Sequence, residues 1–219
     1  MPKLYIYGTV GYDIDADYVR LALDDIVGEL EVRINSGGGD VFEGNSIYSL
    51  LKYWNAQDGN NLTIYVDGLA ASIASVIAMA ADEIYMSNNS LMMIHNPWIP
   101  SAAGDAEDLR ETANILDKVR DTLITVYEDR TGLDRDTISE LMNEETWLTA
   151  KEAVTFGFAD SIVNGSEMPT ASIKNFAYAN APQFLLDETR QLVHSDKPLV
   201  PMSLQKAKVA YSRCCNKQP

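Results

Sequence analysis

The sequence predicts an α/β fold whose sheet is mainly parallel. Short apolar runs with β-branched residues, such as 30–34 and 62–66, alternate with stretches whose apolar residues recur at three- and four-residue steps, such as 41–54. Strands that alternate with helices form β-α-β units, in which the strands lie parallel. A third observation is the amphipathic stretch at 105–131, which is much longer than the others and predicts one long helix.

The first half of the chain supplies most of the sheet. We expect strands at residues 4–7, 30–34 and 62–66, and helices at 15–27 and 41–54. Asp15 or Asp17 can cap the first helix, because a carboxylate accepts hydrogen bonds from the unpaired backbone N–H groups there. After the third strand, the residues at 67–69 predict a tight turn, and a helix rich in small residues follows from about Ala71 to Ala81.

The second half continues the alternation with shorter elements. We expect strands at 83–86 and 91–94, helices at 105–131 and 134–142, an extended stretch at 145–148, a helix at 150–156 and a final strand at 161–163. Gly132 ends the long helix, since glycine adopts the left-handed backbone of a C-cap without strain. Thr149 and Glu152 have the spacing of a capping box at the start of the helix at 150–156.

Composition divides the chain into two parts. Residues 1–165 carry the periodic pattern and are expected to form one domain. Residues 166–219 show scattered apolar residues without a sustained period, which predicts a C-terminal appendage that is only partly ordered. The two cysteines, Cys214 and Cys215, are adjacent and provide neither a disulfide framework nor metal-ligand spacing, so we expect no metal and no cofactor.

Charge and hydropathy exclude two classes of partner. The net charge of −15 argues against a nucleic-acid-binding protein and against docking on anionic membranes, because both need a basic surface. The chain begins in a strand-like run without a leader, and its longest apolar stretch, 70–81, is too short to span a bilayer. We therefore expect a cytoplasmic protein.

Ser72 is a candidate nucleophile. It lies where the strand at 62–66 is expected to give way to a helix, a junction that can expose a hydroxyl beside unpaired backbone N–H groups. The surrounding pattern is G-x-A-A-S (68–72) and differs from the G-x-S-x-G elbow of α/β-hydrolases, so that topology is not implied. From these residues alone, Ser72 could equally serve only to pack the helix start.

A glycine-rich segment, Asn35-Ser36-Gly37-Gly38-Gly39-Asp40, also follows a predicted strand. Consecutive glycines let another group approach the backbone N–H groups closely. Such a segment could cradle a phosphate, supply an N–H to a developing oxyanion, or act only as a flexible turn. The Lys-Ser/Thr of a P-loop is missing, which disfavours the phosphate reading.

His95 is the candidate general base. It ends the predicted strand at 91–94, and histidine is the side chain best suited to move a proton near neutral pH. A lone histidine at a strand end is often only a satisfied turn residue. Here it shares the sheet with Ser72 and the glycine-rich segment, and active groups gather at the carboxyl ends of parallel strands.

Four collinear segments resemble the proteolytic subunits of the Clp protease, the ClpP family. They are INSGGG (34–39), GLAAS (68–72), MIHNP (93–97) and LTAKEAVTFGFAD (148–160), and the resemblance covers roughly residues 4–163. It implies a serine endopeptidase on a ClpP/crotonase-like fold, in which repeated β-β-α units form a mainly parallel sheet with a long protruding helix. It also implies protein or peptide substrates and a homo-oligomeric ring assembled through the helix at 105–131.

Carried over position by position, the resemblance implies a catalytic triad. Ser72 would be the nucleophile and His95 its general base, and the backbone N–H groups of Gly39 and Ile73 would form the oxyanion hole. The family's third residue is an aspartate three positions before the L-[ST]-A segment, and here that position holds Glu145. A glutamate can also stabilise an imidazolium. The adjacent Glu144 is an alternative, and Glu145 could otherwise be a solvated acid.

The chain departs from the family at both ends. It lacks the N-terminal extension that helps ClpP gate its pore, which argues against a ring ATPase partner. A short N-terminus together with an appendage at 166–219 looks more like the ClpP-related head-maturation proteases of phages and prophages. The expected function is therefore cleavage of scaffold and capsid proteins, inside a procapsid or in the host cytoplasm, with the appendage removed by processing or docked on a neighbouring subunit.

Three other functions remain open from the sequence. The first is an ATPase-dependent Clp-type subunit that degrades proteins. The second is a crotonase-like enzyme acting on acyl-thioesters, which shares the oxyanion hole and does not need the pair of Ser72 and His95. The third is a catalytically silent structural protein on the same fold, for which Glu145 would mark a broken triad.

Overall fold

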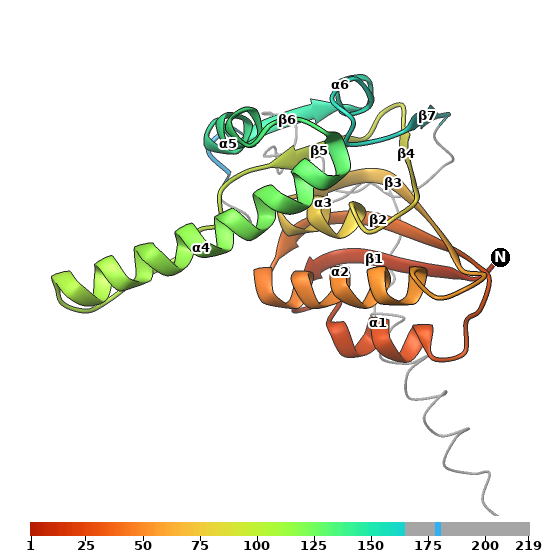
Figure 1. The fold of residues 1–219 in the computed structure, drawn as a ribbon, viewed down its shortest axis with the longest axis horizontal. Coiled ribbons are helices and arrows are strands. Elements are labelled where there is room, and N and C mark those ends of the chain that lie inside the picture. Colours follow the sequence, from red (N-terminus) through yellow and green to blue (C-terminus); the bar gives the residue numbers. More distant parts are fainter. Residues whose placement is uncertain (165–177, 181–219) are drawn as a thin grey trace, which may run out of the picture. The chain divides into compact units, whose positions relative to one another are not determined.

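The computed structural model describes residues 1–164 and 178–180 (Figure 1). In these ranges the elements are, in chain order, β1 (Lys3–Val10), α1 (Ala16–Leu23), β2 (Glu29–Gly39), α2 (Val41–Asn55), β3 (Asn61–Ala71), α3 (Ile73–Ala78), β4 (Glu83–Ser87), β5 (Leu91–Ile94), α4 (Ala106–Thr131), α5 (Arg135–Asn143), β6 (Thr146–Thr149), α6 (Ala150–Thr155) and β7 (Ser161–Val163).

The strands form one sheet with the order β1-β2-β3-β4-β7. All pairs along this path are parallel, as the sequence predicted. Beyond residue 68, β3 changes partner and pairs with β5, which in turn pairs with β6 in the antiparallel sense. The carboxyl end of β3 is therefore flanked by β2 on one side and β5 on the other, and this is where the candidate site lies.

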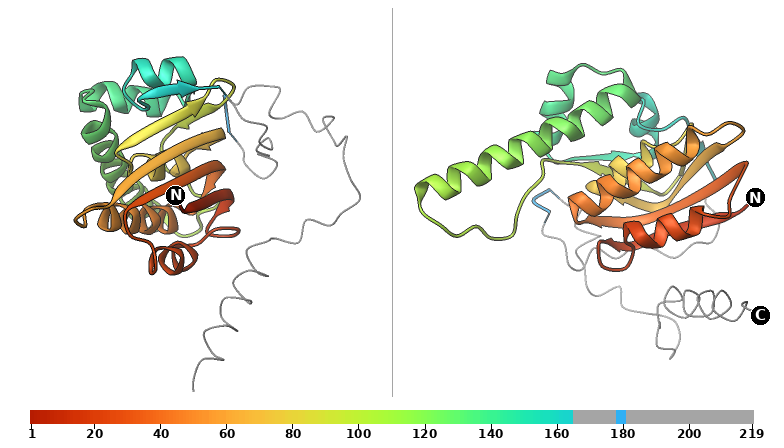
Figure 2. Two further views of the ribbon diagram at one scale, coloured as in Figure 1. Left: turned by 90° about the vertical axis from the view of Figure 1, so that its right-hand side faces the viewer. Right: turned by 60° about the horizontal axis from the view of Figure 1, so that its bottom comes forward.

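Helices α1, α2 and α3 cover one face of the sheet (Figures 1 and 2). The strand residues that point to these helices are aliphatic, and several are completely buried, for example Ile6, Val32, Ile34, Ile64 and Ile84. Full burial of an aliphatic side chain contributes about 1.5–3 kcal/mol. This face of the sheet therefore forms the core that fixes the ends of β2, β3 and β5 relative to one another.

The opposite face of β1, β2 and β3 carries a charged network. The carboxylate of Asp67 accepts hydrogen bonds from the Tyr7 hydroxyl (2.6 Å) and from Arg33 Nε (2.8 Å), and a second guanidinium nitrogen of Arg33 contacts its other oxygen. Arg33 also pairs with Glu31 at 3.0 Å and lies over the ring of Tyr65. The network joins three adjacent strands through side chains as well as through the backbone.

This network explains an error in the sequence prediction. Asp67-Gly68-Leu69 was expected to be a tight turn, but β3 continues through it to Ala71, and the following helix begins at Ile73. Aspartate and glycine favour turns when the carboxylate stays in water. Here Arg33 and Tyr7 satisfy that carboxylate inside the fold, and Leu69 to Ala71 gain a ladder with β5.

The glycine-rich segment is likewise part of a strand. Gly37 to Gly39 were expected to lie between a strand and a helix, but they continue β2, where Gly38 pairs with Thr9 and Gly39 with Val10. A Cβ at Gly39 would lie 2.1 Å from the carbonyl oxygen of Val10. Glycine at this position therefore serves a close approach of two strands.

Other predicted elements are confirmed. The strand at 91–94 is β5, and the long helix is α4, capped by Asp105 and ended by Gly132 in the left-handed conformation. Thr149 and Glu152 form the expected capping box. Helix α4 protrudes from the sheet for most of its length (Figure 2). Asp15, the first of the two expected caps, accepts from the Tyr18 N–H at the start of α1.

The predicted appendage is described only at Tyr178, Ala179 and Asn180. The remainder of residues 166–219, including Cys214 and Cys215, lies outside the described residues, and so does the expected processing of this part. Within the described ranges, no helix combines the length and the apolar character that a membrane span requires.

Candidate active site

Ser72 lies between the last residue of β3 and the first residue of α3. Its backbone has a φ of 55° and a ψ of −129°, a conformation that non-glycine residues rarely adopt. Its N–H donates to the carbonyl of Met93 on β5 (2.9 Å), and its Oγ lies 2.7 Å from Nε2 of His95. A strained backbone at a polar side chain is typical of functional sites, where the surrounding structure holds it in place.

The buried hydroxyl groups of Ser75 and Tyr127 stabilise the backbone conformation of Ser72. Ser75, on α3, donates a hydrogen bond from its hydroxyl to the carbonyl oxygen of Ser72 (2.6 Å). The same hydroxyl lies 2.8 Å from the hydroxyl of Tyr127 on α4. Both side chains are buried, so the junction between strand and helix is tied to the long helix by polar contacts inside the core.

His95 follows directly after β5. Because β3 and β5 are parallel, with Ala71 opposite Met93, the residues that follow these strands emerge at the same edge of the sheet. This register places Ser72 and His95 together although 23 positions separate them in the chain. Burial lowers the pKa of His95 from its ordinary value of 6.5, and the negative charge of Glu145 opposes that change.

Glu145 lies at the start of β6, with a φ of 49°. Its negative charge raises the pKa of His95, against the larger effect of burial. Within the described part of the chain, however, Glu145 makes no hydrogen bond to His95. Its Oε1 accepts from the Trp147 indole N–H (3.2 Å) and from the N–H of Asn180 (2.7 Å), and its Oε2 accepts from the N–H of Ala179 (2.8 Å).

The glycines of β2 pass beside Ser72. Gly38 has a φ of 94°, and a Cβ at this position would lie 2.8 Å from the Cβ of Ser72 and from the carbonyl oxygen of Ala71. Its N–H donates to the hydroxyl of Ser36 (3.1 Å). Gly39 faces β1. Ile73 is the first residue of α3, so its N–H has no partner within the helix.

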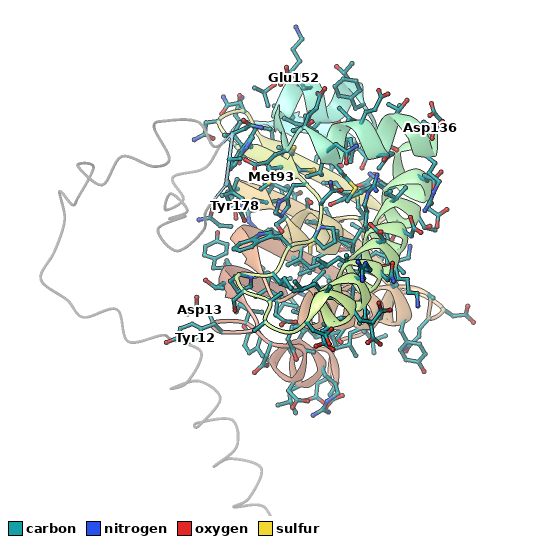
Figure 3. The ribbon with its side chains drawn as sticks, turned by 90° about the vertical axis from the view of Figure 1, so that its left-hand side faces the viewer. Tyr12, Asp13, Met93, Asp136, Glu152 and Tyr178 are labelled. Carbon is teal, nitrogen blue, oxygen red and sulfur yellow. The ribbon has the colours of Figure 1, made fainter. Side chains whose placement is uncertain are left out.

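Tyr178 is a residue of this site that the sequence did not indicate. Its ring packs edge-on against His95 (5.4 Å between centroids) and Trp147 (5.6 Å), and it clusters with Leu69 and Met93. Figure 3 shows Tyr178 beside Met93 at the end of the sheet. No sequence signal singles it out, because Phe176, Phe184 and Tyr211 occur in the same aperiodic region.

The family assignment rests on a match over most of the chain. The family model for Clp protease matches residues 9–166, a range that contains Ser72, His95, Glu145 and the glycines of β2. This chain belongs to the Clp protease family. Its Ser72 and His95 therefore lie together inside the part that the family shares, whereas Tyr178 lies beyond it.

Individual relatives agree with this assignment. The chain is 34% identical over 137 residues to the ATP-dependent Clp protease proteolytic subunit 1 of Protochlamydia amoebophila, covering 61% of this chain and 65%, less than two thirds, of that subunit. It is 32% identical over 161 residues to the ATP-dependent Clp protease proteolytic subunit of Leuconostoc citreum, covering 72% of this chain and 78% of the relative.

The fold also matches that of a solved Clp protein. A point mutant of ClpP1 from Listeria monocytogenes superposes with a TM-score of 0.64 at 23% identity, covering 75% of this chain and 92% of that one. The ClpP-like fold predicted from the sequence is thus confirmed.

Proposed function

We propose that this chain is a serine endopeptidase in which Ser72 is the nucleophile and His95 the general base. The observation that carries the proposal is the distance of 2.7 Å between Ser72 Oγ and His95 Nε2, at the ends of two adjacent parallel strands. A hydroxyl is a weak nucleophile until a neighbouring base accepts its proton. The lowered pKa keeps His95 in the neutral form that can accept that proton near pH 7.

The chemistry follows from this pair. His95 Nε2 takes the proton as Ser72 Oγ forms a bond to the carbonyl carbon of the substrate. The tetrahedral intermediate then breaks its C–N bond, and the leaving amine receives the proton from His95. Water, deprotonated by His95, attacks the acyl-enzyme and regenerates Ser72. The charge of Glu145 stabilises the imidazolium that forms in each half-reaction.

The oxyanion is proposed to bind at two backbone N–H groups, those of Gly39 and Ile73. Ile73 fits because the first N–H of a helix has no intrahelical acceptor. For β2, the absence of a side chain at Gly38, the residue before Gly39, lets the strand pass close to Ser72. Removing one such donor typically costs on the order of 100- to 1000-fold in rate.

We further propose that the subunits assemble into a homo-oligomeric ring that cleaves protein substrates in the cytoplasm. Helix α4 fits this role because it protrudes from the sheet and carries exposed apolar side chains, including Leu109 and Ile115. Apolar side chains on a projecting element favour contact with another chain.

Two biological settings fit this activity. The relatives are named as subunits of ATP-dependent Clp proteases, which favours a Clp-type subunit that works with an ATPase. The residues beyond 166, which the family model does not match, favour a head-maturation protease that cleaves phage scaffold and capsid proteins and its own appendage. Intact mass over time separates the two, because only the second predicts a C-terminal loss that Ser72→Ala abolishes.

A fluorophosphonate probe tests the chemistry itself. It reacts covalently with an activated serine, and we expect labelling that mass spectrometry places on Ser72. The Ser72→Ala and His95→Ala variants should lose the labelling while keeping their thermal unfolding midpoints. A folded wild type that shows no labelling on Ser72 would instead favour a silent structural protein, and labelling that survives His95→Ala would remove the general base from the mechanism.

A further inference from the structure

Tyr178 lies against His95, the partner of Ser72 in the candidate site. Tyr178 is only 7% exposed, and its ring contacts His95 and Trp147. Its hydroxyl donates to the carbonyl oxygen of Gly37 on β2, the strand that passes beside Ser72. Burial raises the pKa of Tyr178, the negative charge of Glu145 raises it further, and a hydrogen bond with the Ser72 side chain lowers it.

The two residues after Tyr178 make hydrogen bonds to Glu144 and Glu145. The N–H groups of Ala179 and Asn180 donate to the two carboxylate oxygens of Glu145, at 2.8 and 2.7 Å. The side-chain amide of Asn180 also donates to the carbonyl of Glu144, at 2.8 Å. Hydrogen bonds to a charged carboxylate are among the stronger ones in proteins.

This arrangement opposes catalysis in two ways. The group presented to Ser72 is a phenol, which has no carbonyl carbon to attack. In addition, Glu145 uses both of its oxygens on Ala179 and Asn180, and it makes no hydrogen bond to His95 among the described residues. The segment therefore packs against the general base and occupies the carboxylate that would stabilise its imidazolium.

We propose that Tyr178-Ala179-Asn180 is an inhibitory segment of this chain. The Tyr178 side chain fills a subsite for an aromatic group lined by Leu69, Met93 and Trp147. The carboxylate of Glu145 accepts hydrogen bonds from the backbone N–H groups of the next two residues. The inference rests on the proposed function, since it assigns a regulation to the same Ser72. The subsite takes peptides with an aromatic residue followed by two residues that keep their N–H groups, which excludes proline at both positions.

The test compares the rate of fluorophosphonate labelling in full-length proteins. Tyr178→Ala empties the aromatic subsite, and Ala179→Pro removes one N–H that Glu145 binds without changing the tyrosine. Both variants should be labelled at least tenfold faster than the wild type. Tyr53→Ala serves as the matched control, because Tyr53 lies on α2 and is 73% exposed, and it should be labelled at the wild-type rate.

A peptide supplied in trans gives an independent readout. A synthetic peptide with the sequence of residues 176–182, at millimolar concentration, should slow the labelling of Tyr178→Ala. The same peptide with alanine in place of its tyrosine should have no effect. This experiment remains informative if the Ala179→Pro variant does not fold.

The outcomes separate the inference from the proposed function. Equal labelling of wild type, Tyr178→Ala and Ala179→Pro would overturn the inhibitory segment and leave the nucleophile in place. Slower labelling of folded Tyr178→Ala would also overturn it, because Tyr178 would then support the site. No labelling of Ser72 in any of these proteins would overturn the proposed function, and the inference would fall with it.

Discussion

The carbonyl oxygen of Ser72 accepts a 2.6 Å hydrogen bond from the hydroxyl of Ser75, the third residue of α3. The hydroxyl of Tyr127 on α4 lies 2.8 Å from the same Ser75 oxygen. The candidate nucleophile thus has its backbone fixed by a helix that, further along, projects away from the sheet.

Ser75→Ala should destabilise the protein by about 1–3 kcal/mol, because it leaves the buried Tyr127 hydroxyl without its partner. It should also slow the labelling of Ser72, whose strained backbone loses a hydrogen bond. Urea denaturation measures the first effect. Adding Tyr127→Phe should recover part of the lost stability, since removing both polar partners costs less than orphaning one. A double variant less stable than Ser75→Ala would contradict this account.

Gly38→Ala should impair the site more than the fold. An added Cβ at Gly38 meets Ser72 and the carbonyl of Ala71 at 2.8 Å, and the φ of 94° adds strain. Gly59→Ala is the matched control, with a φ of 84° and nothing within 4 Å. Both should cost about 1–2 kcal/mol for the left-handed backbone, and the collision adds a further cost in Gly38→Ala alone. Only Gly38→Ala should strongly reduce the labelling of Ser72. Equal labelling of the two variants would show that a side chain at Gly38 does not displace Ser72.

The labelling rate should fall at acidic pH with a midpoint below 6.5. Neutral His95 is the reactive form, and burial lowers its pKa, so reactivity is retained above that pKa and lost as the pH falls through it. Glu145 raises the pKa of His95, so Glu145→Gln should move the midpoint to still lower pH. A pH profile of the labelling rate checks both points. An unchanged midpoint in Glu145→Gln would mean that the charge of Glu145 does not act on His95, and a shift to higher pH would contradict the expected sign.

Arg33→Gln should destabilise the protein by about 3–5 kcal/mol, because it leaves the Asp67 carboxylate, whose side chain is 1% exposed, without its cation. Arg20→Gln is the control, since the ion pairs of Arg20 with Asp17 and Asp24 are exposed and are worth about 1 kcal/mol or less. Urea denaturation of both variants gives the comparison. Similar losses in the two would show that Asp67 is not held by Arg33.

The sequence was informative wherever a local rule and the tertiary structure agree. Ser72 and His95 could be proposed because each follows an apolar strand, and the parallel register of β3 and β5 then brings them together. The caps at Thr149 and Gly132 obey local hydrogen-bonding and φ preferences, which do not depend on distant residues.

The wrong or absent predictions have a common cause: each residue concerned has an interaction partner far away in the chain. Asp67-Gly68 is a turn signal until Arg33, 34 positions earlier, binds the carboxylate. Tyr178 reaches the site from beyond the region matched by the family, and its contacts with His95 and Trp147 leave no periodic pattern in the sequence. The backbone N–H groups that donate to Glu145 could not be inferred for the same reason.

The inhibitory segment is covalently attached to the site that it fills, through the 13 residues at 165–177. Two groups joined by a short linker meet at an effective concentration of about millimolar. Contacts too weak to retain a free peptide at cellular concentrations are therefore sufficient to keep Tyr178 beside His95 of its own subunit. Cleavage of one peptide bond in 165–177 would make the binding of the inhibitory segment bimolecular. Dilution alone would then release the segment from the site.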